Sequence, residues 1–179
     1  MTHEYFGYDL PARGGEPFVD ALLDLAARSG MDAYGDVAFG YLYAVEHLLA
    51  RCPSARLMCL QRDRAETVDS LWRWSGPRHH WTEHDGLEWQ CDPWDHCFPK
   101  FGLADKRAAV ERYWDSYYAA ARAWEQARPD AVRVFPMDAL NSESGQRAIL
   151  DFAGYAPQDM RLHVGLRLNP LEKARHLTA

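Results

Sequence analysis

An arginine and a serine stand where they could bind a phosphate together. Arg62 follows the apolar run 57–60, and Ser70 comes eight residues later in a segment with helical periodicity. A guanidinium at the carboxyl edge of a sheet can bind phosphate through two parallel hydrogen bonds, and a hydroxyl on the next helix can add another to the same oxygens. Alternatively, Arg62 pairs at the surface with Asp63 or Asp69, and Ser70 is an ordinary helix residue.

A second group of reactive side chains lies between His79 and Phe101. Its potential metal ligands are His79, His80, His84, Cys91, His96 and Cys97. Their spacing does not match the usual structural zinc motifs, so we expect no metal and keep a zinc-stabilised domain as the weakest hypothesis. The aromatic residues of this segment are Trp81, Trp89, Trp94 and Phe98. They could line an acceptor pocket or pack beneath the loop as a satellite core, and both alternatives stay open.

Length and charge limit what such sites could bind. The 179 residues, 47% of them hydrophobic, predict a single domain over residues 1–179. With 20 Lys and Arg against 26 Asp and Glu, the net charge of −6 disfavours nucleic acid as a partner, so an anionic ligand needs a local basic pocket.

Hydropathy and cysteine content predict the compartment. No apolar stretch has the length of a membrane-spanning helix, and the first residues do not resemble a signal peptide. We therefore expect a cytoplasmic protein that does not associate with membranes. Its four cysteines, Cys52, Cys59, Cys91 and Cys97, are expected to be free thiols, with Cys59 in the core.

Helical periodicity is clear in several segments. A helix is expected from Pro17 until Gly30 ends it, and a second from Asp36, as its N-cap, until Pro53. Further helices are expected after Arg62 and Asp63 until residues 75–77, over 104–127, and over 142–152. The segment 104–127 has the best helical pattern, because its apolar residues recur at intervals of three and four.

Two apolar runs predict strands. Residues 57–60 form a continuous apolar run, which favours a strand covered on both faces, and residues 132–135 form a second strand. Strands that alternate with helices indicate an α/β fold with a mainly parallel sheet flanked by helices. In such folds ligands bind beyond the carboxyl ends of the strands, which is where Arg62 lies.

Several of these segments together resemble the sulfotransferase family. The motif Pro53-Ser54-Ala55-Arg56, the strand that ends in Arg62-Asp63, and Ser70 eight positions after the arginine are similar to the family's 3'-phosphate-binding segment. Arg64 stands where the family usually has proline. The resemblance continues through Tyr113–Tyr118, through Val132–Leu140 with Asp138 in an acidic position, and through Ile149–Gly154. It covers residues 36 to 154 approximately.

The resemblance implies a P-loop-kinase-like fold and a sulfuryl transfer. The donor would be 3'-phosphoadenosine 5'-phosphosulfate (PAPS), and the acceptor a hydroxyl or amine of a small-molecule, carbohydrate or lipid compound. Arg62 and Ser70 would bind the 3'-phosphate of PAPS or of its product PAP. Glu4 would be the catalytic base, with His3 as the alternative. Trp72 and Trp74 could stack on adenine, or pack in the core or at its rim.

One part of the family pattern has no counterpart in this sequence. The Gly/Ser/Thr-rich loop that binds the 5'-phosphosulfate, and the first strand before it, are not found, so we expect a chain truncated at its N-terminus relative to the family. A sheet without that strand would expose apolar surface, which predicts possible homo-oligomers. The alternative to an enzyme is a catalytically inactive sulfotransferase-like binding or interaction domain.

Overall fold

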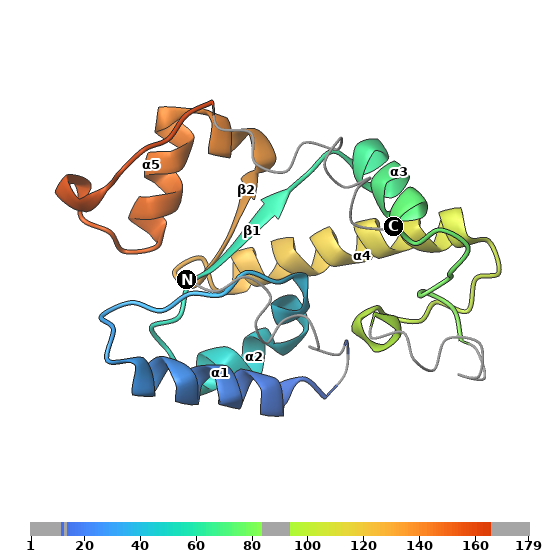
Figure 1. The fold of residues 1–179 in the computed structure, drawn as a ribbon, viewed down its shortest axis with the longest axis horizontal. Helices are drawn as coiled ribbons and strands as arrows, with labels where there is room; N and C mark the ends of the chain where they lie inside the picture. The colour runs from blue at the N-terminus through green and yellow to red at the C-terminus, as the bar shows by residue number, and fades with distance from the viewer. Residues whose placement is uncertain (1–11, 13, 84–93, 166–179) are drawn as a thin grey trace, which may run out of the picture.

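The computed structural model describes residues 12, 14–83 and 94–165 (Figure 1). In this part of the chain five α-helices and two β-strands follow one another as an α/β fold. They are α1 (Glu16–Ser29), α2 (Val45–Arg51), β1 (Leu57–Gln61), α3 (Arg64–Trp74), α4 (Lys106–Ala127), β2 (Val132–Pro136) and α5 (Glu143–Phe152). Short 3-10 turns are η1 (Phe39–Ala44), η2 (Asp95–Cys97), η3 (Met137–Asn141) and η4 (Pro157–Asp159).

The two strands pair in parallel, as the sequence predicts. The register runs from Leu57 opposite Val132 to Gln61 opposite Pro136. Parallel strands cannot be joined by a tight turn, so the chain leaves the carboxyl end of β1, passes through α3 and α4, and returns to the start of β2. Residues that follow β1 and residues that follow β2 therefore lie at the same edge of the sheet.

Different helices cover the two faces of this sheet, as Figure 1 shows. On one face, Val132 and Val134 pack with Ala121 of α4 and Val45 of α2. On the other, Leu60 and its neighbours pack against α5 in a cluster formed by Phe135, Ala139, Ile149 and Phe152. The sheet is thus a central layer, and each face has its own apolar contacts.

A separate aromatic core fills the space between α3, α4 and residues 79–83 and 94–101. Its buried members are Val68, Trp81, Cys97, Phe98, Ala109, Val110 and Tyr113. Trp81 is fully buried and its ring centroid lies 4.7 Å from that of Phe98. For Trp81 and Phe98 this settles the alternatives in favour of a satellite core, whereas Trp89 lies outside the described residues.

Two sequence predictions about coverage and helix boundaries are wrong. Asp36 does not cap a helix, because regular structure resumes at η1, and its carboxylate instead accepts a hydrogen bond from the Tyr41 hydroxyl at 2.5 Å. Strand β1 is not covered on both faces, since the Met58 side chain is 40% exposed. Helix α5 packs against Leu60 and leaves Met58 at the surface.

The other helix boundaries follow the local signals. Gly30 ends α1 in the left-handed conformation (φ 65°). The side chains of Asp63, Asp105 and Ser142 each accept a backbone N–H in the first turn of α3, α4 and α5. The helix with the best sequence pattern, α4, runs over Lys106–Ala127, and it buries Val110 and Ala121.

We predict that Gly145→Ala destabilises the protein. An alanine Cβ at this position would lie 2.2 Å from the carbonyl oxygen of Ala139, so α5 and η3 would have to move apart. The helix-propensity gain of alanine should be outweighed, with a loss of about 2 kcal/mol in the free energy of unfolding. Urea denaturation measures this, and Ala148→Gly, also in α5, should lower stability only by helix propensity, about 1 kcal/mol. Equal or greater stability of the Gly145 variant would contradict the packing.

Candidate functional site

Arg62 lies in the two-residue link between β1 and α3. Strand β1 ends at Gln61 and α3 begins at Arg64, which places the exposed Arg62 at the carboxyl edge of the sheet. This is the position that the sequence predicts, and in parallel α/β folds it is the edge where ligands bind. Ser70 lies in the second turn of α3 and is partly buried.

The first turn of α3 fixes the backbone after Arg62. The Asp63 carboxylate accepts the Glu66 N–H at 2.9 Å, and the Asp63 carbonyl accepts the Thr67 hydroxyl at 2.6 Å. Ser70 follows Glu66 by four residues and Thr67 by three, so these positions share one side of the helix. The N-cap, the first turn and Ser70 thus follow each other along that side.

The guanidinium of Arg62 has no carboxylate partner in the described part of the chain. Asp63 is occupied as the N-cap, and Asp69 accepts a hydrogen bond from Arg107 at 2.7 Å. No ion pair or side-chain hydrogen bond of Arg62 occurs among the described residues, and the same holds for hydrogen bonds of the Ser70 hydroxyl. The surface pairing of Arg62 with Asp63 or Asp69 is therefore not observed, and its positive charge remains open to an anion.

Side chains of helix α4 contact the end of β1, Arg62 and the start of α3. The Tyr118 hydroxyl donates to the Leu60 carbonyl at 3.0 Å, and the Arg62 N–H donates to the same hydroxyl at 3.3 Å. Arg64 donates to both carboxylate oxygens of Asp115, at 2.8 and 2.9 Å. The sequence predicts that Asp115 and Tyr118 lie on a helix, but it contains no signal that pairs them with the end of β1.

Two of these residues have shifted pKa values. The hydrogen bond from Arg64 lowers the pKa of Asp115, which keeps this carboxylate charged well below neutral pH. Burial raises the pKa of Tyr118, so its hydroxyl keeps the proton that it donates to Leu60. Both groups thus hold the protonation state that their hydrogen bonds need.

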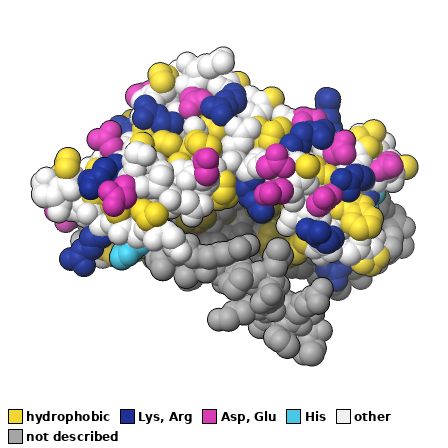
Figure 2. Space-filling view, turned by 90° about the horizontal axis from the view of Figure 1, so that it is seen from above, with side chains coloured by type: hydrophobic (Ala, Val, Ile, Leu, Met, Phe, Trp, Pro, Cys, Tyr) yellow, Lys and Arg dark blue, Asp and Glu magenta, His cyan; other side chains and the backbone are white. Residues whose placement is uncertain are grey.

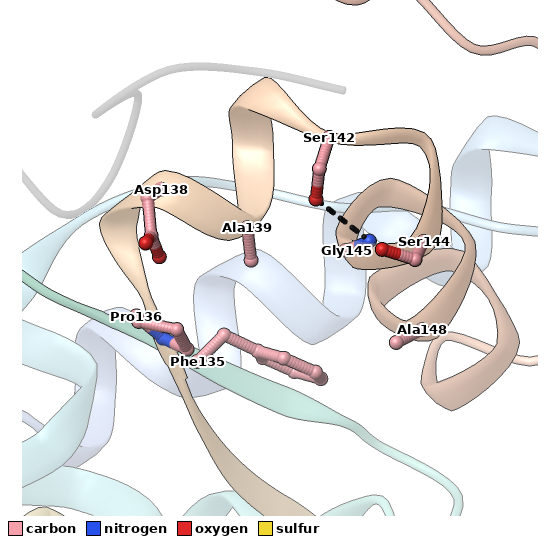
Figure 3. Close-up of a pocket in the computed structure, with 8 residues that line it drawn as sticks. All are labelled: Phe135, Pro136, Asp138, Ala139, Ser142, Ser144, Gly145 and Ala148. Carbon is pink, nitrogen blue, oxygen red and sulfur yellow. Dashed lines mark hydrogen bonds between the residues drawn. The ribbon is translucent and has the colours of Figure 1, made fainter.

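An open pocket of about 430 Å³ lies at the end of the neighbouring strand β2 (Figure 3). Its lining residues are Phe135, Pro136, Asp138, Ala139, Ser142, Ser144, Gly145 and Ala148. Its polar groups come from η3 and the start of α5, and the Ser142 hydroxyl is already used, because it accepts the Gly145 N–H at 3.1 Å. Pro136 pairs with Gln61, the residue before Arg62, so pocket and candidate arginine share one edge of the sheet.

The surface charge around these elements is mixed. Figure 2 shows a face on which Lys and Arg side chains alternate with Asp and Glu side chains, without a large patch of one sign. Binding of an anion would therefore depend on individual side chains such as Arg62 and not on the overall field, in agreement with the net charge of −6.

Other predicted site residues lie elsewhere or outside the described part. Glu4, His3, His84 and Cys91 are outside it. Among the described residues no group of three or more His, Cys, Asp or Glu side chains could hold a metal ion.

Trp72 and Trp74 are 46% and 48% exposed at the end of α3, and the Lys106 ammonium lies 4.9 Å from the centroid of the Trp72 ring. They lie at the rim of the aromatic core.

The cysteines are free thiols where the structure describes them. Cys52, Cys59 and Cys97 form no disulfide, and Cys91 lies outside the described residues. Cys59 packs against the core on β1, as predicted, and burial raises the pKa of its thiol to about 11. The thiol next to the candidate site is thus protonated at neutral pH and a poor nucleophile.

Comparisons of the chain with known proteins identify no relative. The chain matches no protein-family model, no curated protein and no solved structure. In the part of the chain that the structure describes, no helix is both long and apolar enough to cross a membrane.

We predict that Asp115→Asn destabilises the protein in a pH-dependent manner. Because Arg64 lowers the pKa of Asp115 in the folded state, the ion pair contributes stability above the ordinary pKa of about 3.9, and this contribution is lost as pH falls through the folded-state pKa. The pair is half exposed, so the loss at pH 7 should be below about 1 kcal/mol.

Urea denaturation of the wild type and this variant from pH 7 to pH 3 measures the difference, which should shrink toward acid. Asp24→Asn is the control, since Asp24 is exposed on α1 and forms no ion pair within the described residues. A difference that grows on acidification would show that the carboxylate does not act as a charged partner of Arg64.

Proposed function

We propose that this chain is a sulfotransferase-like domain, on a fold related to P-loop kinases, that binds the 3'-phosphate of PAPS with Arg62 and Ser70. The observation that carries the proposal is the Arg62 guanidinium, which lies exposed at the carboxyl edge of a parallel sheet with no carboxylate partner among the described residues. It lies in the segment whose sequence resembles the family's 3'-phosphate site.

The hydrogen bonds of the neighbouring acids leave this arginine accessible to a ligand. A guanidinium can form two parallel hydrogen bonds to a phosphate, and a hydroxyl from the adjoining helix can add a neutral one. The nearby acids Asp63, Asp69 and Asp115 are each occupied by another donor, so they do not neutralise Arg62 directly. An anion that reaches this edge thus meets a cation whose hydrogen-bonding capacity is unused.

The proposed reaction transfers a sulfuryl group. An acceptor hydroxyl or amine attacks the sulfur of PAPS, a new S–O or S–N bond forms, and the bond from sulfur to the bridging oxygen breaks. The electron pair of that bond stays with the 5'-phosphate of the departing PAP, and the acceptor proton goes to a base, for which we propose Glu4. The acceptor is a small-molecule, carbohydrate or lipid compound.

We predict that the chain binds PAP and that Arg62→Ala abolishes most of the affinity. Loss of a charge-assisted bidentate contact costs about 1.5–3 kcal/mol, which corresponds to a Kd about 10- to 100-fold higher. Isothermal titration with PAP measures it. Arg73→Ala is the matched control, because Arg73 is an exposed arginine on α3 that lies beyond Ser70, and its variant should retain the wild-type Kd.

Adenosine 5'-phosphate serves as the ligand control. It lacks the 3'-phosphate, so its Kd should be the same for the wild type and Arg62→Ala. Equal PAP affinity of the wild type and Arg62→Ala, or no binding of PAP by the folded wild type, would reject the 3'-phosphate site.

The second candidate function is nucleotide binding without transfer. It is favoured by the order of the elements, because within the described residues no strand precedes β1 and α1 follows Gly14 and Gly15 without a Ser or Thr between them. The described part therefore offers no loop of the kind that binds a 5'-phosphosulfate, and the proposed 3'-phosphate site would serve binding or interaction.

Turnover of PAPS separates the two candidates. If the chain is an enzyme, incubation with PAPS and a panel of hydroxyl and amine acceptors yields PAP in proportion to a sulfated product. Glu4→Gln should then lower kcat by about 100-fold or more and leave the PAP affinity unchanged, because a general base acts on the acceptor and not on the 3'-phosphate. PAP binding without any turnover would favour the binding domain, and an unchanged kcat in Glu4→Gln would remove Glu4 as the base.

A further inference from the structure

We propose that three residues on one side of α4, Asp115, Tyr118 and Arg122, position Arg62 for its anion. We call them the α4 row. The inference rests on the proposed 3'-phosphate site and adds the part of the molecule that determines its geometry. These are positioning residues, because their side chains contact the end of β1 and the start of α3 and leave the Arg62 guanidinium free.

Tyr118 holds the backbone on both sides of Gln61. Its hydroxyl donates to the Leu60 carbonyl at 3.0 Å and accepts the Arg62 N–H at 3.3 Å. One hydroxyl thus uses its donor and an acceptor site on two backbone groups that lie two residues apart. This fixes the direction in which the chain leaves β1, and hence the backbone position of Arg62.

The other two members of the row hold the residues next to Arg62. Asp115 binds both nitrogens of the Arg64 fork, at 2.8 and 2.9 Å, a geometry that restricts orientation as well as distance. Arg122 donates to the Gln61 side chain at 2.7 Å and is itself oriented by Glu125 at 2.9 Å. The residue before Arg62 and the residue two after it are both bound to α4.

The spacing of the row explains why these contacts form together. Positions 115, 118 and 122 differ by three and four residues, so they form one stripe along the helix. Along this stripe the partners run backward along the chain, from Arg64 in α3 to Arg62 and then to Gln61 at the end of β1. The row therefore contacts the end of β1, the Arg62 backbone and the first residue of α3.

This arrangement matters because no hydrogen bond or ion pair within the described part holds the Arg62 side chain itself. Side-chain freedom lost on binding costs about 0.5–1.5 kcal/mol for a long side chain, and a loose backbone would add to that cost. Because Gln61, the Arg62 backbone and Arg64 are all bound to α4, the guanidinium is the main group left to be ordered by the anion. The α4 row should therefore raise affinity for a phosphate without contacting it.

Tyr118→Phe tests the inference most directly. It removes the hydroxyl and keeps the ring, so the fold should persist. We expect a Kd for PAP about fivefold higher than that of the wild type, as for the loss of about one hydrogen bond. In the protein without nucleotide, NMR should show faster hydrogen exchange at the Arg62 amide. Tyr117→Phe is the matched control, because its hydroxyl donates to the Phe39 carbonyl and not to the link, and it should change neither quantity.

A double-mutant cycle distinguishes positioning from general loss of stability. Arg62→Lys replaces the rigid guanidinium, which benefits from orientation, by an ammonium on a flexible side chain. In this background, adding Tyr118→Phe should raise the Kd for PAP by less than twofold relative to Arg62→Lys alone. An effect of equal size in both backgrounds would mean that Tyr118 does not act through Arg62, and would overturn the inference.

Arg64 provides a second test with a rescue. Arg64→Gln should raise the Kd for PAP about threefold, whereas Arg51→Gln, which breaks an ion pair between α2 and α1, should leave it unchanged. Arg64→Pro should restore the affinity. Proline suits the first helical position, the preceding Asp63 already has the extended ψ of 140° that proline requires, and the Arg64 N–H makes no hydrogen bond within the described residues.

The measurements separate the two proposals. Unchanged exchange at the Arg62 amide in Tyr118→Phe would refute the α4 row whatever the nucleotide does. PAP binding that is lost in Arg62→Ala but equal in the wild type, Tyr118→Phe and Arg64→Gln would keep the phosphate site and refute the row. Absence of PAP binding in the wild type would refute the phosphate site, and with it the role of the row in affinity.

Discussion

Parallel pairing of β1 with β2 is the constraint on which the rest of the structure depends. Because both strands point the same way, the chain must return along the sheet before β2 begins, and α4 provides this return. Its 22 residues extend about 33 Å, whereas a five-residue strand extends about 17 Å. Helix α4 therefore reaches beyond the sheet, so that its first half packs with α3 in the aromatic core and its second half supports the strands. The end of β1 lies over the middle of α4, where polar side chains can reach it.

The Arg62 guanidinium lacks a carboxylate partner in the described part because other donors bind the nearby carboxylates. Helix capping occupies Asp63, and two ion pairs between α3 and α4 occupy Asp69 and Asp115. Each of these contacts has a structural role of its own, and the two exposed ion pairs contribute little energy. Their combined effect is that the arginine at the edge of the sheet keeps its charge without a partner in the described part. The proposed phosphate site thus depends on contacts made by its neighbours.

Local patterns predicted those features that depend on local physics. The stripe of apolar residues located α4, Gly30 marked the end of α1, and the apolar run 57–60 placed Arg62 just beyond a strand. The failures concern tertiary coverage: Asp36 bonds to Tyr41 instead of capping a helix, and Met58 is exposed because α5 covers only part of its face. The contacts of Tyr118 with Leu60 and of Asp115 with Arg64 join residues more than 50 positions apart, and no spacing in a single sequence encodes such a pairing. Glu4, which rests on the resemblance alone, stays a prediction.

The register of the sheet also has a consequence for how the chain folds. Every residue of β1 pairs with a residue about 75 positions later, so the sheet contributes only contacts of high sequence separation. The entropy of closing that loop must be lost before any strand pair is gained, whereas α3 and α4 can form from nearby residues. Contacts between the end of β1 and the middle of α4 shorten the loop that remains open before β2 arrives. The same side chains that hold Arg62 in the folded protein would then guide the assembly of the sheet.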